Sequence, residues 1–148
     1  MKSIIQTLLV ITLISCSPRE TNLHRATKLE QQGKLSEAIL MYEKHIKDRE
    51  KEVREDWENP QFYRLIIADL RTSLNDTDGA LAEVKRAYDA HVDSKLVLDR
   101  VRKIALKIAE LGDTDKAVSL LDEYKSIDEV LVDSTIDRIA KEFIIQKK

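Results

Sequence analysis

The chain has 148 residues and a formal net charge of −2, and charged residues make up 35% of it. This length fits one domain, and the near-neutral charge lacks the basic footprint of a nucleic-acid-binding protein. With 43% hydrophobic residues but only three glycines and two prolines, the composition favours helices over sheets. We therefore expect a single all-α domain that does not bind nucleic acid.

The N-terminal segment differs in character from the rest of the chain. A basic Lys2 precedes a mainly apolar stretch, residues 4–14, which is too short to be a good membrane span. This order is typical of a secretory signal peptide, expected to cover residues 1–15. The stretch ends in Leu13-Ile14-Ser15-Cys16, which resembles the lipobox of bacterial lipoproteins. The resemblance implies cleavage before Cys16 and acylation of its thiol and of its new amino group.

Cys16 is the only cysteine, so no intramolecular disulfide can form. Each buried acyl CH₂ contributes about 0.8 kcal/mol, so two or more chains would anchor the protein stably. Residues 16–22 would then be a short lipidated tether. Ser17 follows the cysteine in place of aspartate, and by resemblance to enterobacterial sorting this implies the periplasmic face of the outer membrane. The alternatives are a buried cysteine ending a core helix and an uncut, cytoplasmic helical protein.

Apolar residues recur at helical spacing through the remaining chain. Helices are expected at residues 21–32, 36–55, 60–74, 78–91, 94–111 and 115–127, and within 133–146. The helix at 60–74 is apolar over much of its circumference, so we expect it to be buried on two sides. The charged residues 47–55 form either a solvated helical extension or a contact surface. Trp57 either packs against the next helix or serves as an exposed binding anchor.

Landmarks recur along the chain in a fixed order. The same spacing separates Ala26 from Ala38, Ala68 from Ala80 and Ala105 from Ala117, and a further small residue follows at Ala140. Between the members of each alanine pair stands a residue type that accepts a left-handed turn: Gly33, Asn75 and Gly112. Capping oxygens for the second helices are expected from Leu35-Ser36, Thr77-Asp78 and Thr114-Asp115.

This pattern resembles the tetratricopeptide repeat, a helix–turn–helix unit of about 34 residues with small residues where its two helices cross. The resemblance implies that residues 23–148 form a short α-solenoid of stacked antiparallel helix pairs, about three repeats with a C-terminal capping helix. A generic helical bundle is the alternative. In this family the first helix of each pair lines a concave groove that binds peptides or helices. The corresponding residues are Leu23, Thr27, Phe62, Leu65, Asp69, Asp99, Arg102 and Leu106.

Candidate chemistry is sparse. The three histidines, His24, His45 and His91, lack metal-ligand spacing, and His45 is expected to be a packed or half-exposed imidazole. There is no phosphate-binding loop and no nucleophile motif, so we expect no enzyme activity, cofactor, metal or small-molecule substrate. The leading hypothesis is an anchored scaffold that binds a protein partner in the cell envelope, possessing no catalysis of its own. The alternative is an accessory subunit of an envelope enzyme that acts on the cell wall.

Overall fold

The computed structural model describes residues 20–52 and 59–144. Several predicted features lie outside these ranges: the signal peptide, the lipobox-like stretch with Cys16, Trp57, the end of the second helix and the last residues of the chain. Every regular element within them is helical: α1 (Asn22–Gln31), α2 (Leu35–Lys51), the 3₁₀ turn η1 (Pro60–Phe62), α3 (Tyr63–Ser73), α4 (Thr77–Asp89), α5 (Ser94–Glu110), α6 (Thr114–Glu123), α7 (Glu129–Ile139) and the π-helical turn η2 (Ala140–Ile144). The prediction of an all-α fold is confirmed.

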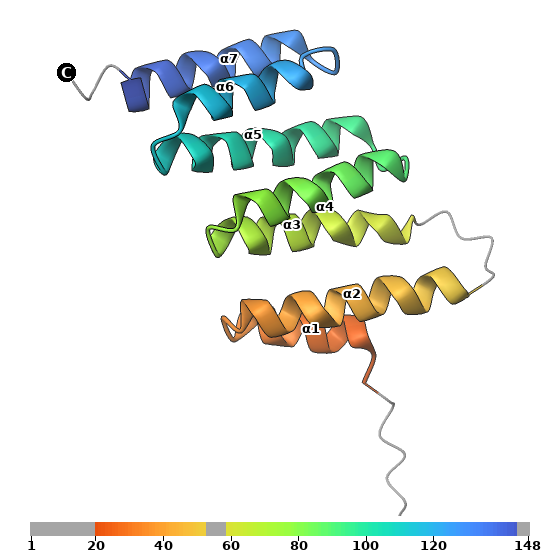
Figure 1. Ribbon diagram of the computed structural model, residues 1–148. Helices are drawn as coiled ribbons and strands as arrows, with labels where there is room; N and C mark the ends of the chain where they lie inside the picture. The colour runs from red at the N-terminus through yellow and green to blue at the C-terminus, as the bar shows by residue number, and fades with distance from the viewer. Residues whose placement is uncertain (1–19, 53–58, 145–148) are drawn as a thin grey trace, which may run out of the picture.

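The helices follow one another in space in the order of the chain. The α1–α2, α3–α4 and α5–α6 pairs make the most extensive contacts, and α7 packs on α5 and α6 (Figure 1). Helix α3 also contacts α2 and α5, so it joins successive pairs. The α1–α2 pair lies at one end of the molecule and α7 at the other (Figure 1). No helix in the described ranges is both long and apolar enough to span a bilayer.

Small residues lie where the paired helices approach most closely. Alanine has no side chain beyond Cβ, so two helices can come together at that level and interlock through larger residues a turn away. Six of the seven alanines that the sequence pattern singles out are completely buried: Ala26, Ala38, Ala68, Ala80, Ala105 and Ala117. The seventh, Ala140, is only partly buried after the end of α7. The spacing of alanines in the sequence therefore reflects helix–helix contacts.

The turns inside the three pairs share one backbone geometry. Gly33, Asn75 and Gly112 have φ values of 72°, 62° and 104°. The following N–H group in each turn donates back to a carbonyl five residues earlier, as in Asp76 N to Arg71 O at 2.9 Å. These turns confirm the sequence prediction. His91 also has a positive φ, 60°, in the α4–α5 connection, and nothing in the sequence pattern predicts it.

Two apolar clusters form the core, and α3 contributes to both. Ile67 and Leu70 pack with the buried residues of α1 and α2. Leu65 and Ala68, on the other side of α3, pack with α4 and α5 in the larger cluster, which continues to Ile139 of α7. The expectation that this helix is buried on two sides is therefore confirmed.

Several helix ends differ from their predicted positions. The caps of α4 and α6 are Asp76 and Asp113, each immediately before the Thr-Asp dipeptide that the sequence suggested, and the cap position of α2 is Lys34, without a side-chain bond. Helix α6 ends at Glu123, and α7 begins at Glu129 because Asp128 accepts a hydrogen bond from Leu131 N. The N-caps of η1 and α5 are Asn59 and Asp93, whose side chains accept from Gln61 N and from Lys95 N and Leu96 N.

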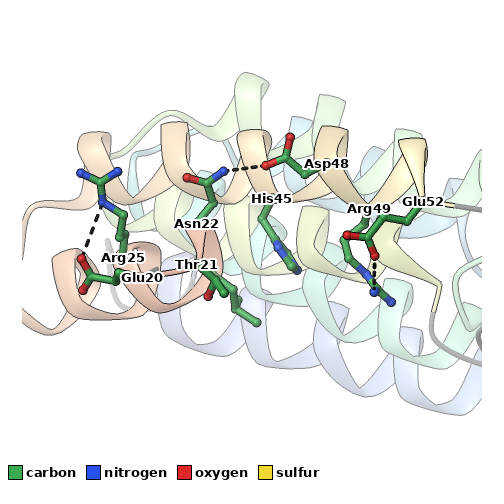
Figure 2. A pocket seen from close by; sticks show the side chains of 9 residues that line it. Glu20, Thr21, Asn22, Arg25, His45, Asp48, Arg49 and Glu52 are labelled. Carbon is green, nitrogen blue, oxygen red and sulfur yellow. Dashed lines mark hydrogen bonds and ion pairs between the residues drawn. The ribbon is translucent and has the colours of Figure 1, made fainter. Parts of the chain in front are cut away.

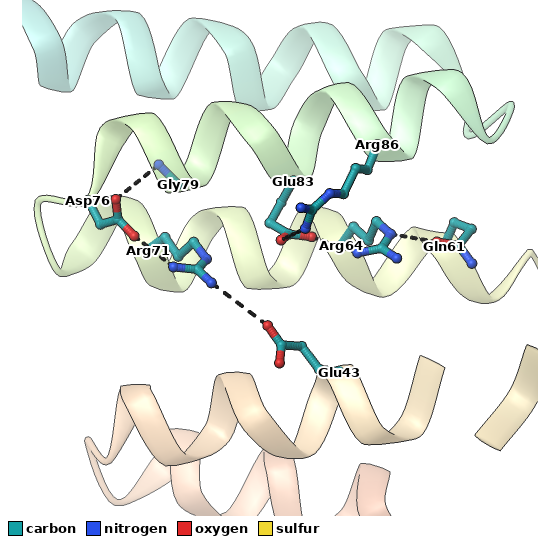
Figure 3. Close-up of polar contacts among 8 residues, drawn as sticks. All are labelled: Glu43, Gln61, Arg64, Arg71, Asp76, Gly79, Glu83 and Arg86. Atoms are coloured by element: carbon teal, nitrogen blue, oxygen red, sulfur yellow. Dashed lines mark hydrogen bonds and ion pairs between the residues drawn. The ribbon is translucent and has the colours of Figure 1, made fainter. Parts of the chain in front are cut away.

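Asp76 connects the α3–α4 turn to a neighbouring helix pair. Its carboxylate accepts from Gly79 N at 2.9 Å and from Arg71 Nη1 at 2.7 Å, and Arg71 also pairs with Glu43 of α2 at 3.7 Å (Figure 3). A Cβ atom at residue 79 would collide with this carboxylate, so glycine permits the close cap. The Arg71 hydrogen bond, helped by Gly79 N–H, lowers the pKa of Asp76 below its usual value.

Replacing Asp76 with alanine is expected to lower the free energy of unfolding by about 1 kcal/mol more than replacing it with asparagine, because asparagine still caps. Because the pKa of Asp76 is lower in the folded state than in the unfolded state, its ionised carboxylate stabilises the fold at pH values above the unfolded-state pKa of 3.8. This stabilisation is lost as the pH falls through the folded-state pKa. The gap in free energy of unfolding between the parent and Asp76→Asn should therefore be constant from pH 7 to pH 5 and become smaller below about pH 4. Urea unfolding at pH 7, 5 and 3 measures it, and a gap that widens at pH 3 would contradict this role.

Candidate functional site

The described chain begins at Glu20, two residues before α1. Glu20 lies close to three basic side chains of the first helix, His24 at 3.5 Å, Arg25 at 3.8 Å and Lys28 at 3.9 Å. Cys16 itself lies outside the described residues. An extended chain spans at most about 3.6 Å per residue, so at most about 14 Å separates Cys16 from Glu20. A lipid on Cys16 would therefore hold the α1–α2 end of the molecule close to a bilayer.

The predicted groove residues do not form one surface. Leu65 is completely buried in the larger core cluster, so its assignment to an open groove is wrong. Leu23 packs with the α1–α2 cluster, whereas Phe62 and Leu106 pack at the edge of the larger one. Thr27 is exposed, and its hydroxyl donates to Leu23 O at 3.1 Å. The α1 positions therefore belong to a different part of the molecule from the α3 and α5 positions.

Asp69 and Asp99, two of the predicted groove residues, do lie together on the contact between α3 and α5. Arg100 Nε is 3.1 Å from Asp69 and its Nη1 is 2.9 Å from Asp99. Lys103 Nζ is 3.2 Å from Asp99 and 4.0 Å from Asp69. We call these four residues the α3–α5 charge cluster. Two carboxylates and two cations neutralise one another, so the cluster offers paired charges to a partner and no free acid or base.

Arg102 points to a different neighbour. Its Nε donates to Thr135 Oγ1 of α7 at 2.7 Å, and Thr135, which is 2% exposed, donates in turn to Leu131 O. Arg102 therefore provides a hydrogen-bond donor to a buried hydroxyl, and this bond connects α5 to α7. Its predicted place beside Asp99 in a groove is therefore not what the structure shows. Of the two residues that do bind Asp99, Lys103 carried only a weak signal in the sequence, its spacing of four residues from Asp99, and Arg100, the next residue, carried none.

A cavity with a volume of about 670 Å³ lies between the start of α1 and the second half of α2, and Figure 2 shows the side chains that line it. Its polar side chains contact one another: Asn22 donates to Asp48 at 2.7 Å, and Arg49 pairs with Glu52 at 3.2 Å. His45 also lines it, and the imidazole packs edge-on against Tyr63 at 4.7 Å, which confirms the expected packed histidine. The sequence did not predict this cavity, because its walls come from helices that only folding brings together.

A second cavity adjoins the first and is more apolar. It has a volume of about 410 Å³ and shares Glu20 and Arg25 with its neighbour. Leu29, Leu40 and Met41 line it, and Leu40 is 54% exposed. In the described ranges, no three His, Cys, Asp or Glu side chains come together in a way that could hold a metal ion.

Comparison with known proteins adds no assignment. No family model, curated protein or solved structure matches the chain.

Proposed function

We propose that this chain is a lipid-anchored protein of the bacterial cell envelope whose helix pairs form a tetratricopeptide-like scaffold for another protein. The observation that carries the proposal is the recurrence of one structural unit. Each of the three pairs has two completely buried alanines at equivalent places and a left-handed residue in its turn. Stacked repeats of this kind bury a continuous core and leave a long surface that suits protein ligands.

The face formed by α3 and α5 is the surface that best suits a partner within this scaffold. The α3–α5 charge cluster lies there, and the half-buried Phe62 of η1 and Leu106 of α5 pack at the edge of the larger core cluster. Leu96, which is 39% exposed, adds apolar area on α5. Protein interfaces combine apolar contact area with a polar rim, and paired charges can exchange partners on binding at modest cost. A peptide or helix with both apolar and charged residues fits this face.

The anchor would determine which part of the scaffold is available. Lipidation at Cys16 would keep the α1–α2 pair near the membrane because the tether to Glu20 is so short. The later pairs would extend away from the bilayer, since α7 lies at the opposite end of the molecule (Figure 1). In this arrangement the α3–α5 face remains open to a partner in the periplasm. Ser17 after the cysteine supports the outer membrane as the site of attachment.

Cys16→Ala tests the anchor. In the parent, intact mass after detergent extraction is expected to show loss of residues 1–15 and addition of acyl chains, and the protein should sediment with membranes. The variant should lose both the added mass and the membrane fraction, because a single short apolar segment without a lipid binds weakly. Parent protein that retains Met1, or a variant that still sediments with membranes, would overturn the lipidation.

The scaffold is tested separately with a photocrosslinking residue at Lys103, in the α3–α5 charge cluster, and a matched one at Asp115, an exposed residue of α6. Lipidated protein in native membranes is expected to crosslink to one envelope protein from position 103 and not from position 115. Equal products from both positions, or none from either, would count against the α3–α5 face.

A further inference from the structure

A small aromatic cavity lies between the C-terminal ends of α4 and α6, away from the surfaces described above. Tyr88 and Tyr124 line it, with ring centroids 6.1 Å apart and planes at 71°. The cavity has a volume of about 280 Å³, and Asp89, Glu123 and Lys85 stand around it. Helices α4 and α6 end on the same side of the molecule, which brings these residues together (Figure 1). We call this site the Tyr88–Tyr124 cavity.

The electrostatics of the cavity favour a cation. Asp89 and Glu123 are the last residues of α4 and α6, and neither forms an ion pair with any residue of the described ranges. The dipoles of two helices add partial negative charge at their C-terminal ends. Lys85 supplies the one opposing charge on the cavity wall. Burial raises the pKa of Tyr124, with further contributions from Glu123 and Asp89, which places both carboxylates near the same phenol.

The aromatic rings favour the same ligand. Tyr88 is 46% exposed, so part of its ring is accessible to a ligand. A ring face attracts a cation, and carboxylates close to the ring attract the same charge. Tyr124, in contrast, packs against the larger core cluster and so holds its ring in a fixed place. The pair therefore presents one exposed and one anchored ring beside two carboxylates.

We propose that the Tyr88–Tyr124 cavity binds the guanidinium group of an arginine side chain from a protein partner. A guanidinium is planar, stacks on aromatic rings and bonds to carboxylates through two N–H groups, whereas an ammonium acts as a point charge. The cavity volume suits a single side chain rather than a helix. This proposal depends on the proposed function in one respect, that the ligand is part of a protein.

A neighbouring cavity provides space for the residues that flank the arginine. It has a volume of about 600 Å³ and shares Tyr88 and Asp89 with the Tyr88–Tyr124 cavity. Val92 and His91 line it, and Asp93, also on its wall, is occupied in capping α5 through Lys95 N at 2.9 Å. The two cavities thus form a continuous surface on which an extended peptide could place one arginine and an adjacent apolar residue.

The test uses the full chain in detergent micelles, labelled with 3-fluorotyrosine and observed by ¹⁹F NMR, with each resonance assigned by single Tyr→Phe substitutions. The probes are acetyl-Gly-Arg-Gly-amide, the same peptide with neutral citrulline, and tetramethylammonium. The arginine peptide is expected to shift the Tyr88 and Tyr124 resonances, with a dissociation constant in the millimolar range, and to leave Tyr42 and Tyr63 unchanged. The citrulline peptide should bind about tenfold more weakly because it lacks the charge.

Two variants locate the site. Glu123→Gln and Tyr88→Leu are each expected to weaken arginine-peptide binding about fivefold, while Asp115→Asn, a matched charge change at the other end of α6, should not. Equal binding of the arginine and citrulline peptides, or no effect of Glu123→Gln, would overturn the cavity assignment. Tighter binding of tetramethylammonium would overturn the choice of a guanidinium. The result is independent of the anchor, because loss of lipidation in the Cys16→Ala experiment would leave arginine binding intact.

Discussion

Leu65→Ala is expected to lower the free energy of unfolding by about 3 kcal/mol. Leu65 is completely buried in the larger core cluster, where α3 meets α4 and α5. Removing most of its side chain there loses apolar burial and leaves a cavity that close-packed helices cannot fully close. Urea denaturation at neutral pH, followed by circular dichroism at 222 nm, measures the change.

The matched control is Leu96→Ala, at a position that is 39% exposed on α5. Its expected cost is below about 1 kcal/mol, because much of the leucine surface is already in contact with water. A small effect at Leu65, similar to that at Leu96, would mean that Leu65 lines an open groove, as the repeat pattern first suggested. The comparison therefore separates a core position from a binding position directly.

Glu83→Ala is expected to lower the free energy of unfolding by about 2–3 kcal/mol. Glu83 is 2% exposed and accepts from Arg64 at 2.9 Å and from Arg86 at 2.7 Å (Figure 3). Without the Glu83 carboxylate, Arg64 loses this anionic partner, and the Arg64 side chain is only 20% exposed. The expected cost lies below that for a fully buried pair because that residual exposure lets water reach the guanidinium.

Arg86→Ala is the control, since the Arg86 side chain is 60% exposed and surface ion pairs contribute about 1 kcal/mol or less. The double variant Arg64→Met/Glu83→Met should recover most of the stability, because it leaves no buried charge unpaired and Arg86, which also loses Glu83, is exposed to water. Chemical denaturation of the four proteins measures these changes. If Arg86→Ala costs as much as Glu83→Ala, or the double variant is the least stable of them, Glu83 does not act as the buried centre of this group.

Local sequence predicted the helices well but placed some of their ends wrongly. The caps of α4 and α6 lie in Asp-Thr-Asp stretches, where three successive residues each carry a capping oxygen. Which of them caps depends on the backbone of the preceding residue, Asn75 or Gly112, which is left-handed and directs the next residue into the cap position. Propensity alone cannot make that choice, because all three residue types are good caps.

The candidate site was harder to predict than the helices. Leu65 and Asp69 are one helical turn apart, and a repeat pattern assigns both to the same face. The structure buries Leu65 and leaves Asp69 within reach of Arg100, since the contact of α3 with α5 covers only part of that face. Sequence periodicity identifies the side of a helix that is apolar, but the boundary of burial is set by the neighbouring helix.

The sequence by itself determined the helical class, the left-handed turns and the alanines at the helix crossings, because these depend on residue size and backbone freedom over a few neighbouring positions. It also carried the stretch Leu13-Ile14-Ser15-Cys16, whose resemblance to a lipobox does not depend on the fold. Only the tertiary structure decided that Arg64 meets Glu83, that Asp69 meets Arg100 and that Tyr88 stands beside Tyr124. These partners lie on different helices, and their contacts depend on the angle and rotation at which whole helices pack, which no short stretch of sequence encodes.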